Sequence, residues 1–191
     1  MKIGIAGGIG SGKSYICDRL REKGFKVYDC DSAAKRLIRT SPEIRAQLTA
    51  LIGPDTYELV DGEYHLNKAV VAKFLLTSKS NAKAIDKIVH PAVFKDFQES
   101  GIEWMESAIM YESGIYRLVD KVVVVVAPKE TRIARVMERD HISREKVLEW
   151  MSQQLEQREV ISKADFVIVN DGHTNIDKQI NKIIEQCKKQ F

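Results

Sequence analysis

The sequence predicts an α/β fold in which a parallel sheet of about five strands is flanked by helices. Short β-branched runs alternate with longer segments of helical periodicity along most of the chain. Two of the runs, Val122–Ala127 and Phe166–Val169, are apolar at every position. Strands that helices cover on both faces have this composition. A glycine-rich loop between the first strand and the first helix is the third observation.

The remaining strands are assigned from short β-branched or aromatic runs. Ile3–Ala6 is the first strand, and the helix after its glycine loop ends near Gly24. Phe25–Tyr28 is a second, short strand, and Trp104–Tyr111 is the third. The two apolar runs described above complete the sheet.

The stretch 32–101 interrupts this alternation. Its segments have helical spacing, except for Thr56–Leu66, where Asp61-Gly62 is typical of a hairpin turn. Helical spacing also continues across Pro91, so we expect that helix to be kinked there or to begin again after His90. We interpret 32–101 as a mainly helical insertion.

The rest of the chain, 1–31 and 102–191, is predicted to form one core. Within it, 129–163 is helical and rich in arginine, and Ser143 is placed to cap one of its helices. A last helix carries an apolar stripe from Ile176 to Cys187, which belongs in the core.

Composition excludes several classes of protein. The 191 residues include 30 Lys and Arg against 27 Asp and Glu, a net charge of +3, which does not indicate a nucleic acid or membrane partner. The apolar start is too short for a signal peptide or a membrane span. Three cysteines without a C-x-x-C argue against a disulfide framework or zinc site and favour the cytoplasm. No feature favours a particular oligomeric state.

The glycine loop, Gly7–Ser14, matches the phosphate-binding motif G-x-x-x-x-G-K-[ST]. Glycines let successive backbone N–H groups face the phosphates, and the helix N-terminus adds partial positive charge. Lys13 supplies a cation for the β- and γ-phosphates of ATP, and the Ser14 hydroxyl is a ligand for Mg²⁺. The predicted nucleotide-binding residues of the loop are Gly8, Gly10, Ser11, Gly12, Lys13 and Ser14.

The absence of other motifs narrows the class of phosphate-loop protein to which the chain can belong. The D-x-x-G and N-K-x-D motifs of switch GTPases do not occur. The strand Val122–Ala127 ends at Pro128 and offers no terminal Asp for a metal. Both observations favour a small-molecule kinase of the phosphate-loop (P-loop) fold.

Asp29 and Asp31 follow the second strand. The carboxyl ends of parallel strands line the ligand crevice, where an Asp can accept the proton of an acceptor hydroxyl. The alternative is a pair of turn and helix-capping carboxylates, because Ser32 begins a helical run.

Over nearly the whole chain, the sequence resembles the dephospho-CoA kinase family, which catalyses the last step of coenzyme A synthesis. The order and spacing of the motifs carry the resemblance, since none after the phosphate loop is specific alone. The matching residues are Gly7 to Ser14, Asp29 and Asp31, His90-Pro91, Ile109-Met110-Tyr111-Glu112 with Tyr116, Arg139-Asp140, Gln154, and Ala164 to Gly172.

The resemblance implies a reaction: ATP and 3′-dephospho-CoA give ADP and coenzyme A, with Mg²⁺. It makes Asp31 the base for the ribose 3′-hydroxyl, the insertion 32–101 the holder of the acceptor, and the helices of about 129–163 a lid. It also places His90, Glu112 and Tyr116 on the acceptor side. Without the resemblance, His90 is interpreted as a residue at a helix kink. Glu112 is then a carboxylate at the start of a helix, and Tyr116 an aromatic residue that packs in the core.

The predicted lid contributes two arginines to the site. Arg139 stands where the helix breaks, so its guanidinium can reach the transferring phosphoryl group. Arg135 lies one turn earlier, where it can contact adenine or a phosphate. For Arg132 and Arg158 we prefer a solvated, ion-paired helix face. Asn170 and Gly172 follow the last strand, where kinases of this fold place a loop against adenine.

Four positions depart from the family pattern. Tyr15 replaces a small residue, often Thr, that contacts the α-phosphate, although its place still puts it at the nucleotide. Ala108, Trp150 and Val160 replace a Pro, an Arg and a basic residue. Two rival functions remain: a P-loop kinase of another nucleoside, nucleotide or sugar alcohol, and a non-catalytic nucleotide-binding module.

Overall fold

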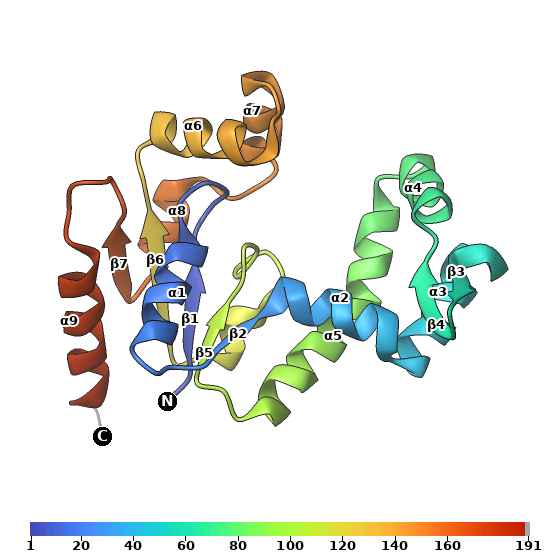
Figure 1. The fold of residues 1–191 in the computed structure, drawn as a ribbon, viewed down its shortest axis with the longest axis horizontal. Helices are drawn as coiled ribbons and strands as arrows, with labels where there is room; N and C mark the ends of the chain where they lie inside the picture. The colour runs from blue at the N-terminus through green and yellow to red at the C-terminus, as the bar shows by residue number, and fades with distance from the viewer. Residues whose placement is uncertain (190–191) are drawn as a thin grey trace. The chain divides into compact units, whose positions relative to one another are not determined.

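A computed structural model describes residues 1–189 and has the predicted α/β architecture (Figure 1). Its main sheet is parallel, with the strand order β2-β5-β1-β6-β7. Since β1 lies between β5 and β6, the loop after β1 leaves the sheet at the centre of its carboxyl edge. The strands are β1 (Ile3–Ala6), β2 (Val27–Asp29), β5 (Trp104–Glu106), β6 (Lys121–Val126) and β7 (Phe166–Val169).

Helices α1 (Lys13–Glu22) and α9 (Ile176–Lys188) cover one face of this sheet (Figure 1). Their apolar stripes pack in one cluster with alternate residues of the strands. The predicted burial of both faces is confirmed for β6, where Val122 to Val126 are all buried. It is wrong for β7, because this strand is at the edge of the sheet and Val167 is exposed.

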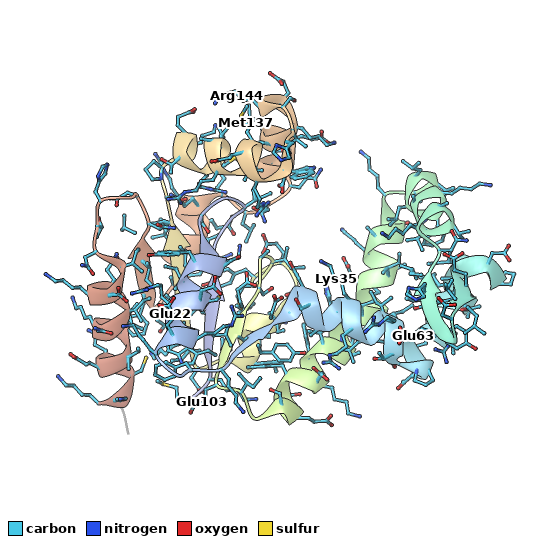
Figure 2. The ribbon with its side chains drawn as sticks, viewed as in Figure 1. Glu22, Lys35, Glu63, Glu103, Met137 and Arg144 are labelled. Carbon is cyan, nitrogen blue, oxygen red and sulfur yellow. The ribbon has the colours of Figure 1, made fainter. Side chains whose placement is uncertain are left out.

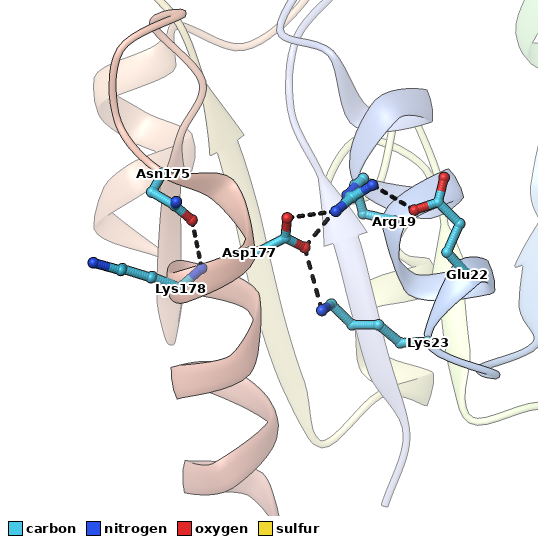
Figure 3. Close-up of polar contacts among 6 residues, drawn as sticks. All are labelled: Arg19, Glu22, Lys23, Asn175, Asp177 and Lys178. Atoms are coloured by element: carbon cyan, nitrogen blue, oxygen red, sulfur yellow. Dashed lines mark hydrogen bonds and ion pairs between the residues drawn. The ribbon is translucent and has the colours of Figure 1, made fainter.

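An ion-pair group joins α1 to α9 (Figure 3). Asp177 accepts a hydrogen bond from Arg19 Nε over 3.3 Å, and its carboxylate lies 3.2 Å from Lys23 Nζ. Asn175 caps α9, because its side chain accepts from the N–H of Lys178 over 2.9 Å. The contacts from Arg19 and Lys23 lower the pKa of Asp177, the Arg19 hydrogen bond most, and hold the two helices side by side.

Strand β5 is shorter than the predicted strand Trp104–Tyr111, because it ends at Glu106. The chain then turns: Ile109 N donates to Ser107 Oγ, and Ser113 N to Ile109 O. The short 3-10 helix η2 (Ile115–Leu118) follows. Met110 is buried although it lies outside the strand. The apolar residues that suggested a longer strand therefore pack in the core from a loop.

Three helices follow β6 and form the segment that we call the lid. They are α6 (Lys129–Asp140), α7 (Arg144–Ser152) and α8 (Gln157–Ser162). The predicted cap is confirmed, since Ser143 Oγ accepts from the N–H of Lys146. Figure 2 shows this segment with its side chains; Arg144, at the start of α7, donates to both carboxylate oxygens of Glu130 at 2.7 and 2.9 Å.

Residues 30–101 form one compact unit, and residues 1–29 together with 102–189 form the other. The expected boundary was 31/32; the observed one precedes α2, which begins directly after β2. Its elements are α2 (Cys30–Thr40), α3 (Pro42–Ile52), the 3-10 helix η1 (Pro54–Thr56), β3 (Tyr57–Val60), β4 (Glu63–Leu66), α4 (Lys68–Thr77) and α5 (Ser80–Ser100).

The predicted hairpin is confirmed. Strands β3 and β4 pair antiparallel, and both turn residues, Asp61 and Gly62, have positive φ, at 51° and 81°. Of the two alternatives expected at Pro91, a kink or a new helix after His90, the second is wrong, because α5 runs unbroken through Pro91. Buried residues on one side of α5, including Val89 and Val93, supply packing that offsets the hydrogen bond lost at the proline. None of the helices within residues 1–189 is both long and apolar enough to cross a membrane.

Candidate functional site

The phosphate loop lies where the motif predicted it, between β1 and α1. Gly12 precedes the first helical residue and has φ of 91°, a conformation that L side chains rarely adopt. A Cβ at Gly12 would also collide with the side-chain amide of Asn170, and one at Gly8 with the guanidinium of Arg132. The φ of Gly12 requires a glycine there, and the close contacts at both positions show that two other segments lie against the loop.

Lys13 stands at the start of α1 with its side chain largely buried. Its Nζ donates to the carbonyl of Gly7 over 2.8 Å and lies 3.7 Å from Oε1 of Glu106. Only 11% of the Lys13 side chain and 14% of the Glu106 side chain are exposed. Glu106 ends β5, and sequence reasoning missed it because the strand was expected to continue to Tyr111.

The lid holds the middle of the loop through Ile9. The N–H of Ile9 donates to Gln154 Oε1 over 2.8 Å, and its carbonyl accepts from Arg132 Nε over 2.9 Å. Arg132 also donates to Gln157 Oε1 at 3.3 Å. The interpretation of Arg132 as a solvated, ion-paired residue is wrong: the side chain is buried, and burial lowers its pKa. Arg158, which shared that interpretation, is exposed.

The loop after β7 packs against the other side of the phosphate loop. Asn170 is buried, and its Nδ2 donates to the carbonyl of Ser11 over 2.9 Å. Arg135 donates to the carbonyls of Asn170, at 3.2 Å, and Ser11, at 3.4 Å. The Ser11 hydroxyl is itself buried, and no residue of the described chain bonds to it. Arg135 and Asn170 therefore fix this side of the loop together.

A cavity of about 570 Å³ opens beside this arrangement. Such a volume is in the range of small-molecule sites. Five residues predicted to bind the nucleotide line it, together with the start of α9: Gly12, Tyr15, Arg135, Asn170 and Gly172. The structure thus brings together residues that lie as much as 160 positions apart, since 172 − 12 = 160.

Asp171 shapes the loop that carries Asn170 and Gly172. Its carboxylate accepts from the N–H groups of His173 and Thr174 at 2.9 and 2.8 Å, and from the Thr174 hydroxyl at 2.9 Å. These bonds, led by the Thr174 N–H, lower the pKa of Asp171 to about 2.

Arg139 lies in the last turn of α6 and is exposed. Its Nε and Nη2 donate to the two carboxylate oxygens of Asp140 at 2.8 and 2.7 Å. This pairing raises the pKa of Arg139 and lowers that of Asp140. The guanidinium is therefore oriented by its neighbour, whereas Arg135 is bonded to the phosphate loop.

Glu112 and Tyr116 line a separate cavity of about 590 Å³. Glu112 Oε1 accepts from the N–H of Leu155, so the loop after β5 is bonded to the lid over 3.2 Å. The rings of Tyr111 and Tyr116 lie 5.4 Å apart, and Tyr111 donates to the carbonyl of Lys163. Burial raises the pKa of Tyr111 to about 12.

Two predicted residues belong to the unit 30–101. Asp31 lies in the first turn of α2, one residue after the helix begins, so it is not the N-cap residue that the structural alternative required. His90 lies within α5, where its ring stacks on Phe94 and Nε2 is 3.6 Å from Asp86.

The residues at the loop suit a magnesium ion that travels with a nucleotide. Mg²⁺ prefers few protein oxygens plus water and substrate phosphates. Ser14 offers a hydroxyl in the first turn of α1, and Glu106 a carboxylate beside the neighbouring lysine. A dedicated cluster of three or more His, Cys, Asp or Glu ligands does not occur among residues 1–189.

Comparison with known proteins identifies relatives over the whole length of the chain. Residues 1–176 match the family model described as dephospho-CoA kinase. The dephospho-CoA kinase of Porphyromonas gingivalis is 40% identical, covering 97% of this chain and 94% of that protein. That of Bacteroides fragilis is 38% identical, covering 96% and 91%.

Solved structures support the same fold. The crystal structure of TT1252 from Thermus thermophilus superposes with a TM-score of 0.81 at 29% identity, covering 97% of this chain and 96% of that one. Shikimate kinase from Bacteroides thetaiotaomicron, at 12% identity and a TM-score of 0.58, covers 98% of each chain and shares the fold alone. With its phosphate loop intact and relatives matched from end to end, the chain belongs to the dephospho-CoA kinase family of enzymes.

Proposed function

We propose that this chain transfers the γ-phosphoryl group of Mg²⁺-ATP to the ribose 3′-hydroxyl of 3′-dephospho-CoA, giving coenzyme A and ADP in the cytoplasm. The observation that carries the proposal is the phosphate loop at the centre of the sheet's carboxyl edge, with Lys13 at its end, in a member of this family.

On the nucleotide side, Lys13 binds the β- and γ-phosphates and Ser14 is a ligand of the magnesium ion. Bound Mg²⁺ supplies charge neutralisation between the phosphates. The cavity beside Gly12 receives the adenosine part, with Arg135 and Asn170 against it. Their bonds to the Ser11 carbonyl support this assignment, because they keep the loop and the adenine-side segment together.

On the acceptor side, the unit 30–101 holds the coenzyme A portion. Asp31 accepts the proton of the 3′-hydroxyl, or aligns that hydroxyl by accepting its hydrogen bond. Its place directly after β2 supports the role, since the carboxyl ends of parallel strands carry the ligands in open α/β sheets. His90, Glu112 and Tyr116 contribute to acceptor binding.

Arg139 stabilises the phosphoryl group while it is transferred from ATP to the acceptor. A guanidinium fork matches the equatorial oxygens of that group, whose charge spreads as the bond to ADP lengthens. Asp140 accepts both hydrogen bonds of that fork. In the proposed reacting complex the phosphoryl oxygens replace Asp140 as the acceptors.

The test is an ADP-release assay with purified protein, Mg²⁺-ATP and one acceptor at a time. Dephospho-CoA is expected to give rapid turnover, and coenzyme A should form in step with ADP. Adenosine, AMP, deoxyadenosine and shikimate should give at most background rates. Faster turnover with any of these than with dephospho-CoA would reject the proposed acceptor, and a folded protein that uses none would reject the proposed activity.

A further inference from the structure

Tyr15 carries a large aromatic side chain that is not part of the core. It lies in the first turn of α1, two residues after Lys13, and it is 52% exposed. Burial of an aromatic ring is favourable, so an open ring beside a ligand site contributes to binding when the ligand covers it. Packing within the protein does not account for Tyr15, whereas contact with a ligand does.

The contacts of α1 show which way Tyr15 faces. Residues four apart share one face of a helix, so Tyr15 lies on the face of α1 that carries Arg19. Arg19 Nε donates to the carboxylate of Asp177, at the start of α9, over 3.3 Å (Figure 3). The pKa of Arg19 is raised, most by its hydrogen bond to Asp177 and also by the phenol of Tyr15. Tyr15 and Arg19 therefore both lie on the side of α1 that faces α9.

On that side lies the cavity of about 570 Å³ beside the phosphate loop. Tyr15 lines it from α1, and Asn170 and Gly172 line it from the loop after β7. Among the described residues of its lining, Tyr15 is the only aromatic one, and most of the others are small or polar. The ring of Tyr15 is therefore the flat, largely apolar surface of this cavity.

The length of the side chain decides which part of a nucleotide the ring meets. In the proposed function Lys13 and Ser14 serve the terminal phosphates and the magnesium ion. The family pattern has a small residue at the next position, often a Thr that contacts the α-phosphate. Tyrosine carries its ring well beyond the reach of a threonine hydroxyl, so the ring of Tyr15 extends past the α-phosphate to the nucleoside.

Of the two parts of a nucleoside, the base suits this ring better than the ribose. An aromatic ring packs offset on another flat π-system, and stacking on a base is independent of the hydrogen-bonding pattern at the edge of that base. Adenine and guanine therefore gain about equally. A pyrimidine has one ring where a purine has two, so it covers less of the tyrosine and gains less.

We propose that the ring of Tyr15 stacks on the base of the bound nucleotide and makes the site favour purine over pyrimidine triphosphates. This contact takes the place of a hydroxyl bond to the α-phosphate. The inference rests on the proposed nucleotide site and concerns how that site selects its phosphoryl donor.

The test is calorimetric titration of wild type and Tyr15→Thr, in excess Mg²⁺, with ATP, GTP, CTP and inorganic tripolyphosphate. Tyr15→Thr should weaken ATP and GTP by about tenfold each, and CTP by no more than about threefold. Tripolyphosphate has neither ribose nor base, so its Kd should not change. Tyr15→Phe, which keeps the ring and loses the hydroxyl, should stay near the wild-type values for all four ligands.

Tyr64→Thr is the matched control, because Tyr64 is an exposed tyrosine of β4, in the unit 30–101. It should leave all four Kd values unchanged. If Tyr15→Thr melts well below wild type, Tyr15→Leu repeats the comparison with a residue that favours helices and has no ring.

Three results would overturn the inference. An unchanged Kd for ATP in folded Tyr15→Thr means that the ring does not contact the nucleotide. Equal weakening of ATP and CTP means that it packs on the ribose, and equal weakening of ATP and tripolyphosphate that it acts on the phosphates. Wild type that fails to bind Mg²⁺-ATP would instead reject the proposed nucleotide site, so the inference and the function can fail separately.

Discussion

The peptide N–H of Ile9 is hydrogen-bonded to the side chain of Gln154, which lies 145 residues further along the chain. Arg132 donates a hydrogen bond to the carbonyl of Ile9. Both groups belong to the lid segment, and Ile9 belongs to the phosphate loop. Two of the hydrogen bonds that attach the lid to the loop thus meet at Ile9, one at its peptide N–H and one at its carbonyl.

Arg132→Met tests how much the hydrogen bonds of Arg132 contribute to the free energy of unfolding. Methionine fills most of the buried volume but leaves the Ile9 carbonyl and the Gln157 amide without a donor. Losing a buried partner of this kind costs about 1–3 kcal/mol of the free energy of unfolding. Urea unfolding followed by circular dichroism measures the loss. The control Arg158→Met, at an exposed position of α8, should change stability by no more than about 0.5 kcal/mol. Equal effects of the two changes would contradict the role of Arg132.

Some of the site could be predicted because its signal is local. The phosphate loop is eight consecutive residues, Gly7–Ser14, whose glycines and lysine form a motif typical of phosphate binding. Asn170 and Gly172 follow a strand whose apolar run is unmistakable. In each case one short segment of the sequence indicates both the local structure and the chemistry.

Glu106 and Arg132 could not be recognised in that way. The importance of Glu106 depends on β5 ending there, and the apolar residues after it resemble more strand because Met110 packs in the core from a loop. A helical repeat shows which residues share a face with Arg132, but not that this face meets Ile9. Both are consequences of tertiary packing, which a single sequence does not reveal.

The Asp171 carboxylate should titrate far below an ordinary aspartate. Its pKa is lowered to about 2 by the bonds it accepts from Thr174 and His173. Because the folded-state pKa lies below the ordinary aspartate pKa of 3.8, its stabilising effect is present above that pH and is lost as pH falls toward 2. Carboxyl-carbon NMR across pH 1.5 to 6 in about fifteen steps would measure the midpoint. A midpoint near an ordinary aspartate would show that the turn is not formed in solution.

Lys13→Ala should abolish most of the phosphoryl transfer. It removes the cation of the phosphate loop, and losses of this kind reduce kcat by about a hundredfold or more. It also leaves the shielded Glu106 without that partner, so a lower Tm is expected as well. ADP release and thermal melting are the two measurements. Lys26→Ala, before β2 and exposed, is the control. Near-normal turnover of Lys13→Ala would mean that the nucleotide binds elsewhere.

Arg139→Ala should lower kcat more than it raises KM for the acceptor. The proposed contact of Arg139 strengthens as charge develops on the transferring group, so its loss falls mainly on the transition state. Steady-state kinetics with dephospho-CoA separate the two parameters. Arg144→Ala removes another lid arginine, paired with Glu130, and should leave both nearly unchanged. An increase in KM at constant kcat would reassign Arg139 to ground-state binding.

Asp31→Asn tests the base assignment. Asparagine keeps the size of the side chain and one acceptor oxygen, but it cannot take the proton of the ribose hydroxyl. Transfer to dephospho-CoA should therefore fall by roughly a hundredfold or more, the usual contribution of a general base. Calorimetry should find ATP binding nearly intact.

The position of Asp31 in the structure sharpens this experiment. It lies in the first turn of α2, where a carboxylate stabilises the helix by about 0.3–1 kcal/mol through the helix dipole. Glu43 has the same place in α3 of the same unit, so Glu43→Gln reproduces that loss without touching the proposed base. If Asp31→Asn and Glu43→Gln lowered Tm equally and both retained wild-type turnover, Asp31 would be a helix-stabilising residue and another group would have to accept the proton. A hundredfold loss confined to Asp31→Asn assigns that step to its carboxylate.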